Sequence, residues 1–173
     1  AYSGLNFDYG AEKWNVYGNY NYTFHNSEVL SNTSIDYFQD QLLLSTFQDR
    51  QDTMKLSRFR LGAVVEPTDN HVLGVEVFGL NRQRIFDEEN YVRFTEPDGI
   101  LDEGLTLFRD DIFTDSYNAT FNYKWTIDTL NSKLQFFAAY ALQQNERDNI
   151  SESSYDIGVF PPITARNRSN AQT

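Results

Sequence analysis

Residues 14–24 alternate strictly between two kinds of side chain, and this alternation constrains the fold more than any other feature of the sequence. The even positions are apolar, aromatic or small: Trp14, Val16, Gly18, Tyr20, Tyr22 and Phe24. The odd positions carry only Asn, Tyr and Thr. Because successive side chains of a β-strand point to opposite faces, the segment predicts a strand with one apolar and one polar face. Such a strand fits a half-buried position in a soluble sheet, and it equally fits a membrane strand between lipid and water.

Five further segments show the same alternation, so the sequence predicts six strands. They cover residues 4–9, 58–66, 72–80, 117–127 and 134–142. One face of every segment lacks charged residues, and all strand charges lie on the opposite face. A charge-free face suits contact with lipid, although the core face of a soluble sandwich is also free of charge.

The connections between these segments alternate between short and long. Three are short and rich in turn-forming residues: 10–13, 67–71 and 128–133. Three are long and polar: 25–57, 81–116 and 144–173. Because antiparallel strands place alternate connections at opposite ends of a sheet, all short turns fall at one end and all long loops at the other. Outer-membrane barrels have this asymmetry, whereas compact soluble domains rarely contain several loops of about thirty residues.

The predicted fold class is therefore all-β: a partial, antiparallel, up-and-down transmembrane β-barrel with about six strands and the start of a seventh. Membrane barrels begin at about eight strands, so we expect the sheet to have open edges that the remaining strands of the same barrel would pair. We also expect residues 1–173 to be part of one outer-membrane barrel domain, truncated at both ends and without a plug domain. In the hairpin 117–142, pairing Trp125 with Phe136 keeps the two charge-free faces together.

Aromatic residues on the charge-free face gather near both ends of the predicted strands. Those near the short turns are Tyr9, Trp14, Trp125 and Phe136. Those near the opposite end are Tyr22, Phe24, Tyr117 and Tyr140. Membrane interfaces favour amphipathic rings, so these eight residues are predicted to form two lipid-facing girdles.

The charges on the other face are predicted to face the lumen of the barrel. They are Arg58, Arg60, Glu66, Glu76 and Lys124. Arg60 and Glu76 lie on adjacent predicted strands, close enough for a diagonal ion pair. The charges therefore either pair with one another or select a solute.

Composition excludes several classes of function. The formal net charge of -11 makes nucleic acid and anionic membrane surfaces poor partners. Cysteine is absent, which excludes disulfides and thiolate chemistry. No apolar run approaches the roughly 18 residues of a membrane helix.

No constellation of residues indicates an enzyme, a cofactor or a metal site. His25 and His71 are the two histidines, and without convergent partners both are predicted to be solvated residues at a loop start and in a turn. The acidic stretches 86–90 and 109–115 match no calcium-loop spacing. No catalytic triad or phosphate-binding fingerprint occurs, so the chain is predicted not to be an enzyme, and no substrate-binding residue is assigned.

Two hairpins carry a resemblance to a known family. Residues 117–140 read Tyr-Asn-Ala-Thr-Phe-Asn-Tyr-Lys-Trp-Thr-Ile-Asp-Thr-Leu-Asn-Ser-Lys-Leu-Gln-Phe-Phe-Ala-Ala-Tyr. This segment resembles a recurring hairpin of the Bacteroidota outer-membrane β-barrel proteins of the TonB-dependent receptor type. Residues 4–22 look like another hairpin of that type, and residues 164–173 look like the approach to a further strand.

The resemblance implies a transporter for a bulky solute in the outer membrane of a Gram-negative bacterium. It also implies outer-membrane lipid, the TonB system and a surface lipoprotein as partners. Two other hypotheses stay open: a structural or assembly barrel subunit of a larger outer-membrane complex, and a soluble all-β ligand-binding domain. A plug and a TonB box elsewhere in the protein would favour transport, and solubility without detergent would exclude the membrane hypotheses.

Overall fold

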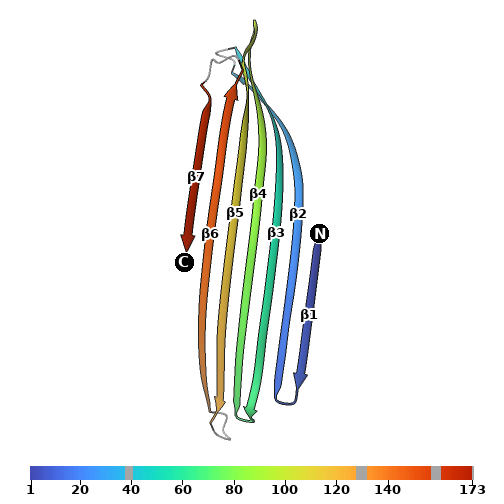
Figure 1. The fold of residues 1–173 in the computed structure, drawn as a ribbon, viewed down its shortest axis with the longest axis vertical. Helices are drawn as coiled ribbons and strands as arrows, with labels where there is room; N and C mark the ends of the chain where they lie inside the picture. The colour runs from blue at the N-terminus through green and yellow to red at the C-terminus, as the bar shows by residue number, and fades with distance from the viewer. Residues whose placement is uncertain (38–40, 128–131, 157–160, 173) are drawn as a thin grey trace.

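A computed structural model describes residues 1–37, 41–127, 132–156 and 161–172. They form one antiparallel sheet in which strands adjacent in sequence are adjacent in space (Figure 1). The strands are β1 (Tyr2–Ala11), β2 (Trp14–Tyr37), β3 (Leu42–Thr68), β4 (His71–Glu96), β5 (Gly99–Thr126), β6 (Lys133–Tyr155) and β7 (Ile163–Gln172). The predicted all-β, up-and-down fold class, with six strands and the start of a seventh, is confirmed. No helix long and apolar enough to cross a membrane occurs among the described residues.

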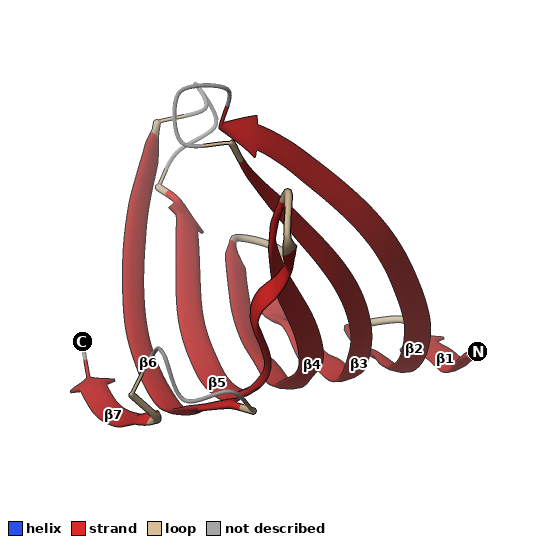
Figure 2. Cartoon of the chain, turned by 90° about the horizontal axis from the view of Figure 1, so that it is seen from above, coloured by secondary structure: helices blue, strands red, loops and turns tan. Residues whose placement is uncertain are grey.

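The sheet is open at both sides. Within the described residues, β1 pairs only with β2 and β7 pairs only with β6. Figure 2 shows the strands following one curved surface, without a second sheet packed face to face against it. The predicted open edges are therefore confirmed.

The strands extend much further than the alternating segments, and the predicted long loops are wrong. Residues 25–37 and 42–57 are instead the outer halves of β2 and β3, residues 81–96 and 99–116 are the outer halves of β4 and β5, and β6 continues to Tyr155. Only Pro97 and Asp98 separate β4 from β5. The prediction failed because these outer halves carry polar residues on both faces, so no apolar alternation marks them as strands.

The opposite ends of the hairpins agree better with the sequence. Glu12 and Lys13 separate β1 from β2, and Asp69 and Asn70 separate β3 from β4. These are tight turns within the predicted short connections 10–13 and 67–71. The third short connection, 128–133, lies largely outside the described residues.

Apart from two irregularities near hairpin ends, the register of the strand pairs preserves the two-residue period, so the charge-free faces join into one surface. Along one row of the sheet, for example, Tyr20 lies opposite Phe59, Phe59 opposite Gly79, and Gly79 opposite Tyr117. We call this side of the sheet the outer face. Its part near the short turns, which lacks charged residues, is the charge-free face. We call the other side the inner face.

The predicted register of the β5–β6 hairpin is wrong by two residues. Trp125 lies opposite Leu134, and Phe136 lies opposite Tyr123. The ladder continues further into the connection than expected, because Thr126 pairs with Lys133 and the Ile127 N–H donates to the Ser132 carbonyl at 2.8 Å. A shift of two residues leaves every side chain on its predicted face, whereas a shift of one would have inverted them.

Burial distinguishes the two faces. The polar side chains at or below 8% exposure all project from the inner face: Asp52, Asp102, Asp110 and Thr114. On the charge-free face, Leu61 and Val75 are each 49% exposed. Neighbouring side chains crowd together on the concave side of a curved sheet and spread apart on the convex side, so the inner face is concave where these residues lie.

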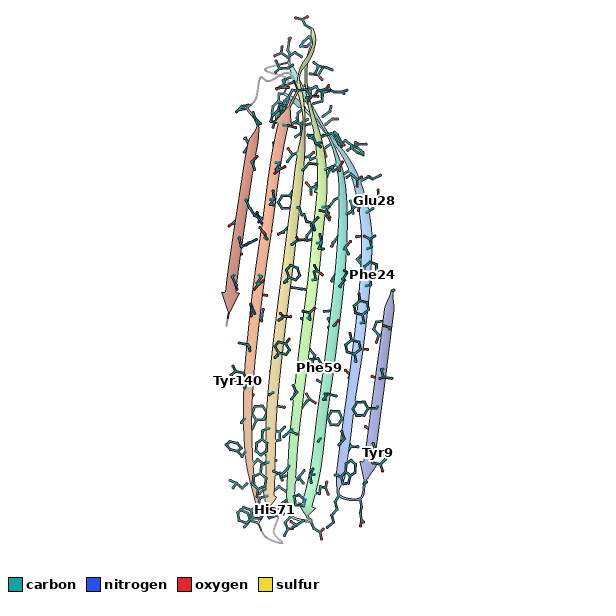
Figure 3. The ribbon with its side chains drawn as sticks, viewed as in Figure 1. Tyr9, Phe24, Glu28, Phe59, His71 and Tyr140 are labelled. Carbon is teal, nitrogen blue, oxygen red and sulfur yellow. The ribbon has the colours of Figure 1, made fainter. Side chains whose placement is uncertain are left out.

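The sheet has almost no apolar core of its own. Among the described residues, Leu56 is the one buried hydrophobic side chain, at 8% exposure. Rings and aliphatic side chains instead stand out from the lower part of the sheet (Figure 3). Because burial of apolar surface is the dominant force in folding, this surface must be covered by something other than the described residues.

Gly62 allows a close approach between strands on the inner face. A Cβ at this position would collide with the ring of Tyr17, which lies over the glycine. From there the Tyr17 hydroxyl reaches across β3 and donates to Glu76 Oε2 on β4 at 2.8 Å. The absence of a side chain at Gly62 thus permits a contact that links three strands.

Replacing Gly62 by valine is expected to displace Tyr17 and lower the free energy of unfolding by about 1–3 kcal/mol. Gly74→Val is the control, because a Cβ at Gly74 meets its nearest atom, Asn122 Cβ, at an ordinary 3.7 Å. The measurement is guanidinium unfolding of the full-length protein purified in detergent. Equal midpoints for the two variants would contradict the proposed close approach.

Candidate functional site: the inner face and its arginines

Six arginines project from the inner face of the sheet. They are Arg50, Arg58, Arg60, Arg82, Arg84 and Arg147. Only Arg58 and Arg60 were among the predicted lumen charges. The others lie in residues that the sequence assigned to loops, although the spacing of Arg82 and Arg84 two residues apart is itself a signal that both point to one face of a strand.

Arg60 and Glu76 form the predicted diagonal ion pair. Arg60 lies opposite Phe78, two residues from Glu76, and its Nε lies 3.4 Å from Glu76 Oε1. Glu76 Oε2 accepts the hydrogen bond from Tyr17. The carboxylate is thus held by partners from β2 and β3 at once.

Arg84 and Asp52 form a second diagonal pair, further from the short turns. Arg84 donates from Nε to Asp52 Oδ1 at 3.0 Å and from Nη2 to Oδ2 at 2.6 Å. These hydrogen bonds from Arg84 hold the pKa of the Asp52 carboxyl below its usual value. The Arg84 guanidinium also lies 4.1 Å from the centre of the Phe86 ring, and that of Arg50 lies 5.7 Å from it. Such cation–π contacts fix the direction of both arginine side chains.

Arg147 and Asp110 repeat the arrangement between β5 and β6. Arg147 donates from Nε to Asp110 Oδ1 at 2.8 Å and from Nη2 to Oδ2 at 2.7 Å. Asp110 is only 3% exposed. A buried carboxylate is tolerated when a guanidinium fork satisfies both of its oxygens, so this part of the inner face is a fixed set of paired charges.

Arg58 and Arg82 differ from these three arginines. Arg82 donates from Nη2 to the Thr114 hydroxyl at 3.2 Å. Among the described residues, neither guanidinium has a carboxylate within ion-pair distance.

The remaining predicted lumen charges lie apart from the arginines. Lys124 and Glu66 are close to the short turns, where the Glu66 N–H donates to the Lys13 carbonyl at 2.7 Å. That these residues and the arginines face a lumen stays a prediction. No group of three potential metal-ligating side chains occurs among the described residues.

The prediction that both histidines are solvated is wrong for His71. This residue begins β4, and its Nδ1 forms a hydrogen bond of 2.7 Å with the Tyr123 hydroxyl. Its ring stacks on Trp125 with centroids 5.7 Å apart. His71 therefore belongs to the aromatic residues near the short turns (Figure 3), because it lies opposite Trp125 on the same face.

The predicted aromatic girdles run obliquely across the rows of paired residues. Near the short turns, Tyr9 on β1 lies two residues above the row of Trp14, and Trp125 on β5 lies two residues below it. That descent of four residues over four strand-to-strand spacings is about 13 Å along the strand for about 19 Å across the sheet. Phe136 departs from this line and lies in the row of Trp14.

The second girdle slopes in the same direction. From Phe24 on β2 to Tyr140 on β6 the descent is six residues over four strand-to-strand spacings. The two slopes correspond to a strand inclination of about 35–45°, which is the tilt of strands in membrane barrels. Tyr22 lies eight residues from Trp14, and Tyr117 lies eight from Trp125. The charge-free band between the two girdles therefore measures about 20–25 Å perpendicular to them, and the upper value takes Phe24 as its far limit.

A separate cavity lies at the tips of the hairpins, on the outer face. Its volume is about 880 Å³, and Phe47 and Tyr91, with ring centroids 6.1 Å apart, are part of its lining. Arg93 and Glu103, which form an ion pair of 2.9 Å, lie beside them. The cavity and the arginines are thus on opposite sides of the sheet.

No protein-family model matches the sequence, and no curated protein matches it. Among solved structures, the chain is similar to the ferric yersiniabactin uptake receptor FyuA from Yersinia pestis, with a TM-score of 0.42 and 9% identity over 99% of this chain and 24% of that one. It is also similar to BauA, the ferric preacinetobactin receptor from Acinetobacter baumannii, with a TM-score of 0.42 and 10% identity over 98% of this chain and 26% of that one.

The chain therefore spans about a quarter of the length of both receptors. The outer-membrane protein OmpT of Vibrio cholerae is less similar, with a TM-score of 0.18 and 7% identity over 98% of this chain and 61% of that one. Likenesses at TM-scores below 0.5 carry no argument about function.

Asp52→Asn is expected to lower the free energy of unfolding at neutral pH by about 1–3 kcal/mol, because Arg84 loses its charged acceptor. The pKa of Asp52 is depressed in the folded state, so this stabilisation is present above the unfolded value of about 4 and is lost as the pH falls towards the folded pKa. The measurement is denaturant unfolding of the full-length protein between pH 3 and pH 7.

The control for Asp52 is Asp87→Asn. Asp87 contacts Arg109 at 3.5 Å with both side chains more than half exposed, and such pairs contribute little. A difference between wild type and Asp52→Asn that stays constant down to pH 3 would show that the charge of Asp52 is not the cause.

Proposed function

We propose that the chain is a wall segment of an outer-membrane β-barrel of the TonB-dependent receptor type, which takes up a bulky solute. The observation that carries the membrane part is the band of exposed, charge-free side chains between two parallel, tilted aromatic girdles. Its height of about 20–25 Å matches the apolar band of membrane barrels, which is about 25 Å. In this assignment lipid covers the apolar surface for which the described residues provide no core.

The eight girdle residues then lie at the two membrane interfaces, and the inner face lines the interior of the barrel. Further strands pair with the free edges of β1 and β7, since an unpaired strand edge exposes backbone groups that lipid cannot satisfy. The row of strands in Figure 2 does not close on itself, which suits a barrel wider than these strands alone could form.

The assignment to transport rests on the inner face and on the family resemblance of the hairpins. Beyond the girdles, β4 continues for residues 81–96, which project about 40 Å at the inferred tilt. The outer face carries charged residues there, including Asp87, Arg93 and Asp115, as expected for a wall that stands in water. The TonB system and a surface lipoprotein are partners that the resemblance alone suggests.

Val75→Arg is expected to reduce the folded, membrane-inserted fraction, because a charge at the lipid-facing midplane costs about 2–4 kcal/mol. Ile85→Arg is the matched control, since Ile85 lies on the same strand and the same face, ten residues further on and beyond the girdles. The measurement is folding of the full-length protein into lipid vesicles, followed by heat-modifiable electrophoretic mobility.

A soluble sheet would show similar defects in both variants, and that result would contradict the membrane assignment. Recovery of the full-length native protein without detergent would exclude it as well. A barrel that inserts normally but lacks a plug in the full sequence would argue against energised uptake while leaving the membrane assignment intact.

A further inference from the structure

Arg58 and Arg82 are diagonal neighbours on the inner face. Arg58 lies opposite Leu80, and Arg82 follows two residues later on β4. Diagonal positions in an antiparallel pair are about 7–8 Å apart, within reach of two long side chains. Both side chains are long enough to reach one group bound above the sheet, and Arg82 would turn from its hydrogen bond with Thr114 on β5 to do so.

The neighbouring charges are already engaged. Arg60 is held by Glu76 on one side of the pair, and Arg84 is held by Asp52 on the other. The residues directly opposite are neutral: Asn21 faces Arg58, and Thr114 faces Arg82. No described carboxylate therefore neutralises these two arginines.

This lack of a carboxylate is unusual for a chain with a net charge of -11. On the outer face beside this level, the carboxylate Asp115 accepts a hydrogen bond from Asn81 Nδ2 at 2.6 Å. Two adjacent positive charges repel each other, so the arrangement costs free energy unless an anion is present.

We propose that Arg58 and Arg82 together bind an anionic group of the solute, either a carboxylate or a phosphate. Both groups match the planar donor fork of arginine, which binds them with two parallel hydrogen bonds. The diagonal pairs Arg60–Glu76 and Arg84–Asp52 flank the site and hold its sides in place. Without an anion, Arg82 donates to the neutral Thr114 hydroxyl, a hydrogen bond that can be exchanged for one to the ligand. This inference rests on the proposed function, because it assigns the solute class for the same inner face.

The test is isothermal titration calorimetry of the full-length protein in detergent, with citrate and pyrophosphate as separate probes. The double variant Arg58→Gln/Arg82→Gln is expected to weaken binding of at least one probe by tenfold or more, because charge-assisted hydrogen bonds are lost. Binding to wild type is expected to weaken as the salt concentration rises. The probe that is affected more strongly identifies the preferred anionic group.

The matched control is Lys55→Gln/Arg109→Gln, which removes two positive charges from the outer face and is expected to leave binding unchanged. Heat-modifiable mobility establishes that each variant is folded and inserted. Failure of the wild-type protein to insert would contradict the proposed function. If the wild-type protein inserts normally but binds neither probe, only the anion site is overturned. A double variant with a lower free energy of unfolding, together with a wild type that binds neither probe, would also overturn the site. The two arginines would then pair with another part of the protein.

Discussion

The two-residue period of side-chain direction, preserved from strand to strand across the band between the aromatic girdles, is the constraint on which the rest of the structure depends. If β3 or β4 shifted by one residue against its neighbours, Arg60 or Glu76 would lie on the charge-free face. The two irregularities in the ladder lie near hairpin ends, between Val65 and Thr68 and beside Phe94. The faces therefore stay separate across the whole band between the aromatic girdles.

This separation explains why a sheet of such length can lack a core. A soluble sheet of this size would cover its apolar face with a second layer, and the described residues supply none. Along the outer halves of the hairpins both faces mix polar and charged residues with apolar ones, and backbone hydrogen bonds of the ladder hold the strands together. The same strands thus pass from a surface that water disfavours to one that water solvates, and the change occurs at the girdle of Tyr22, Phe24, Tyr117 and Tyr140.

The sequence predicts those parts of the fold that alternation and short turns determine. The turn at Asp69 and Asn70 sets the β3–β4 register within a few residues, so the pair Arg60–Glu76 could be predicted. The pair Arg84–Asp52 could not, because it requires knowing that residues 42–57 and 81–96 are strands, and polar side chains on both faces give no period to detect. The predicted β5–β6 register was wrong by two residues for a related reason. The hydrophobic pattern determines which face a side chain lies on, whereas the geometry of the turn determines the register.

The inner face combines two uses of arginine that differ in their surroundings. Where a carboxylate is nearly buried, as Asp110 is, the guanidinium fork is a structural necessity, because an unpaired charge there would cost several kcal/mol. Arg58 and Arg82 are both exposed, so water can solvate them and no internal partner is required. Their positive charge therefore remains available on a concave surface whose neighbouring charges are paired, and electrostatic attraction for an anion is strongest where nearby fixed charges do not compete for it.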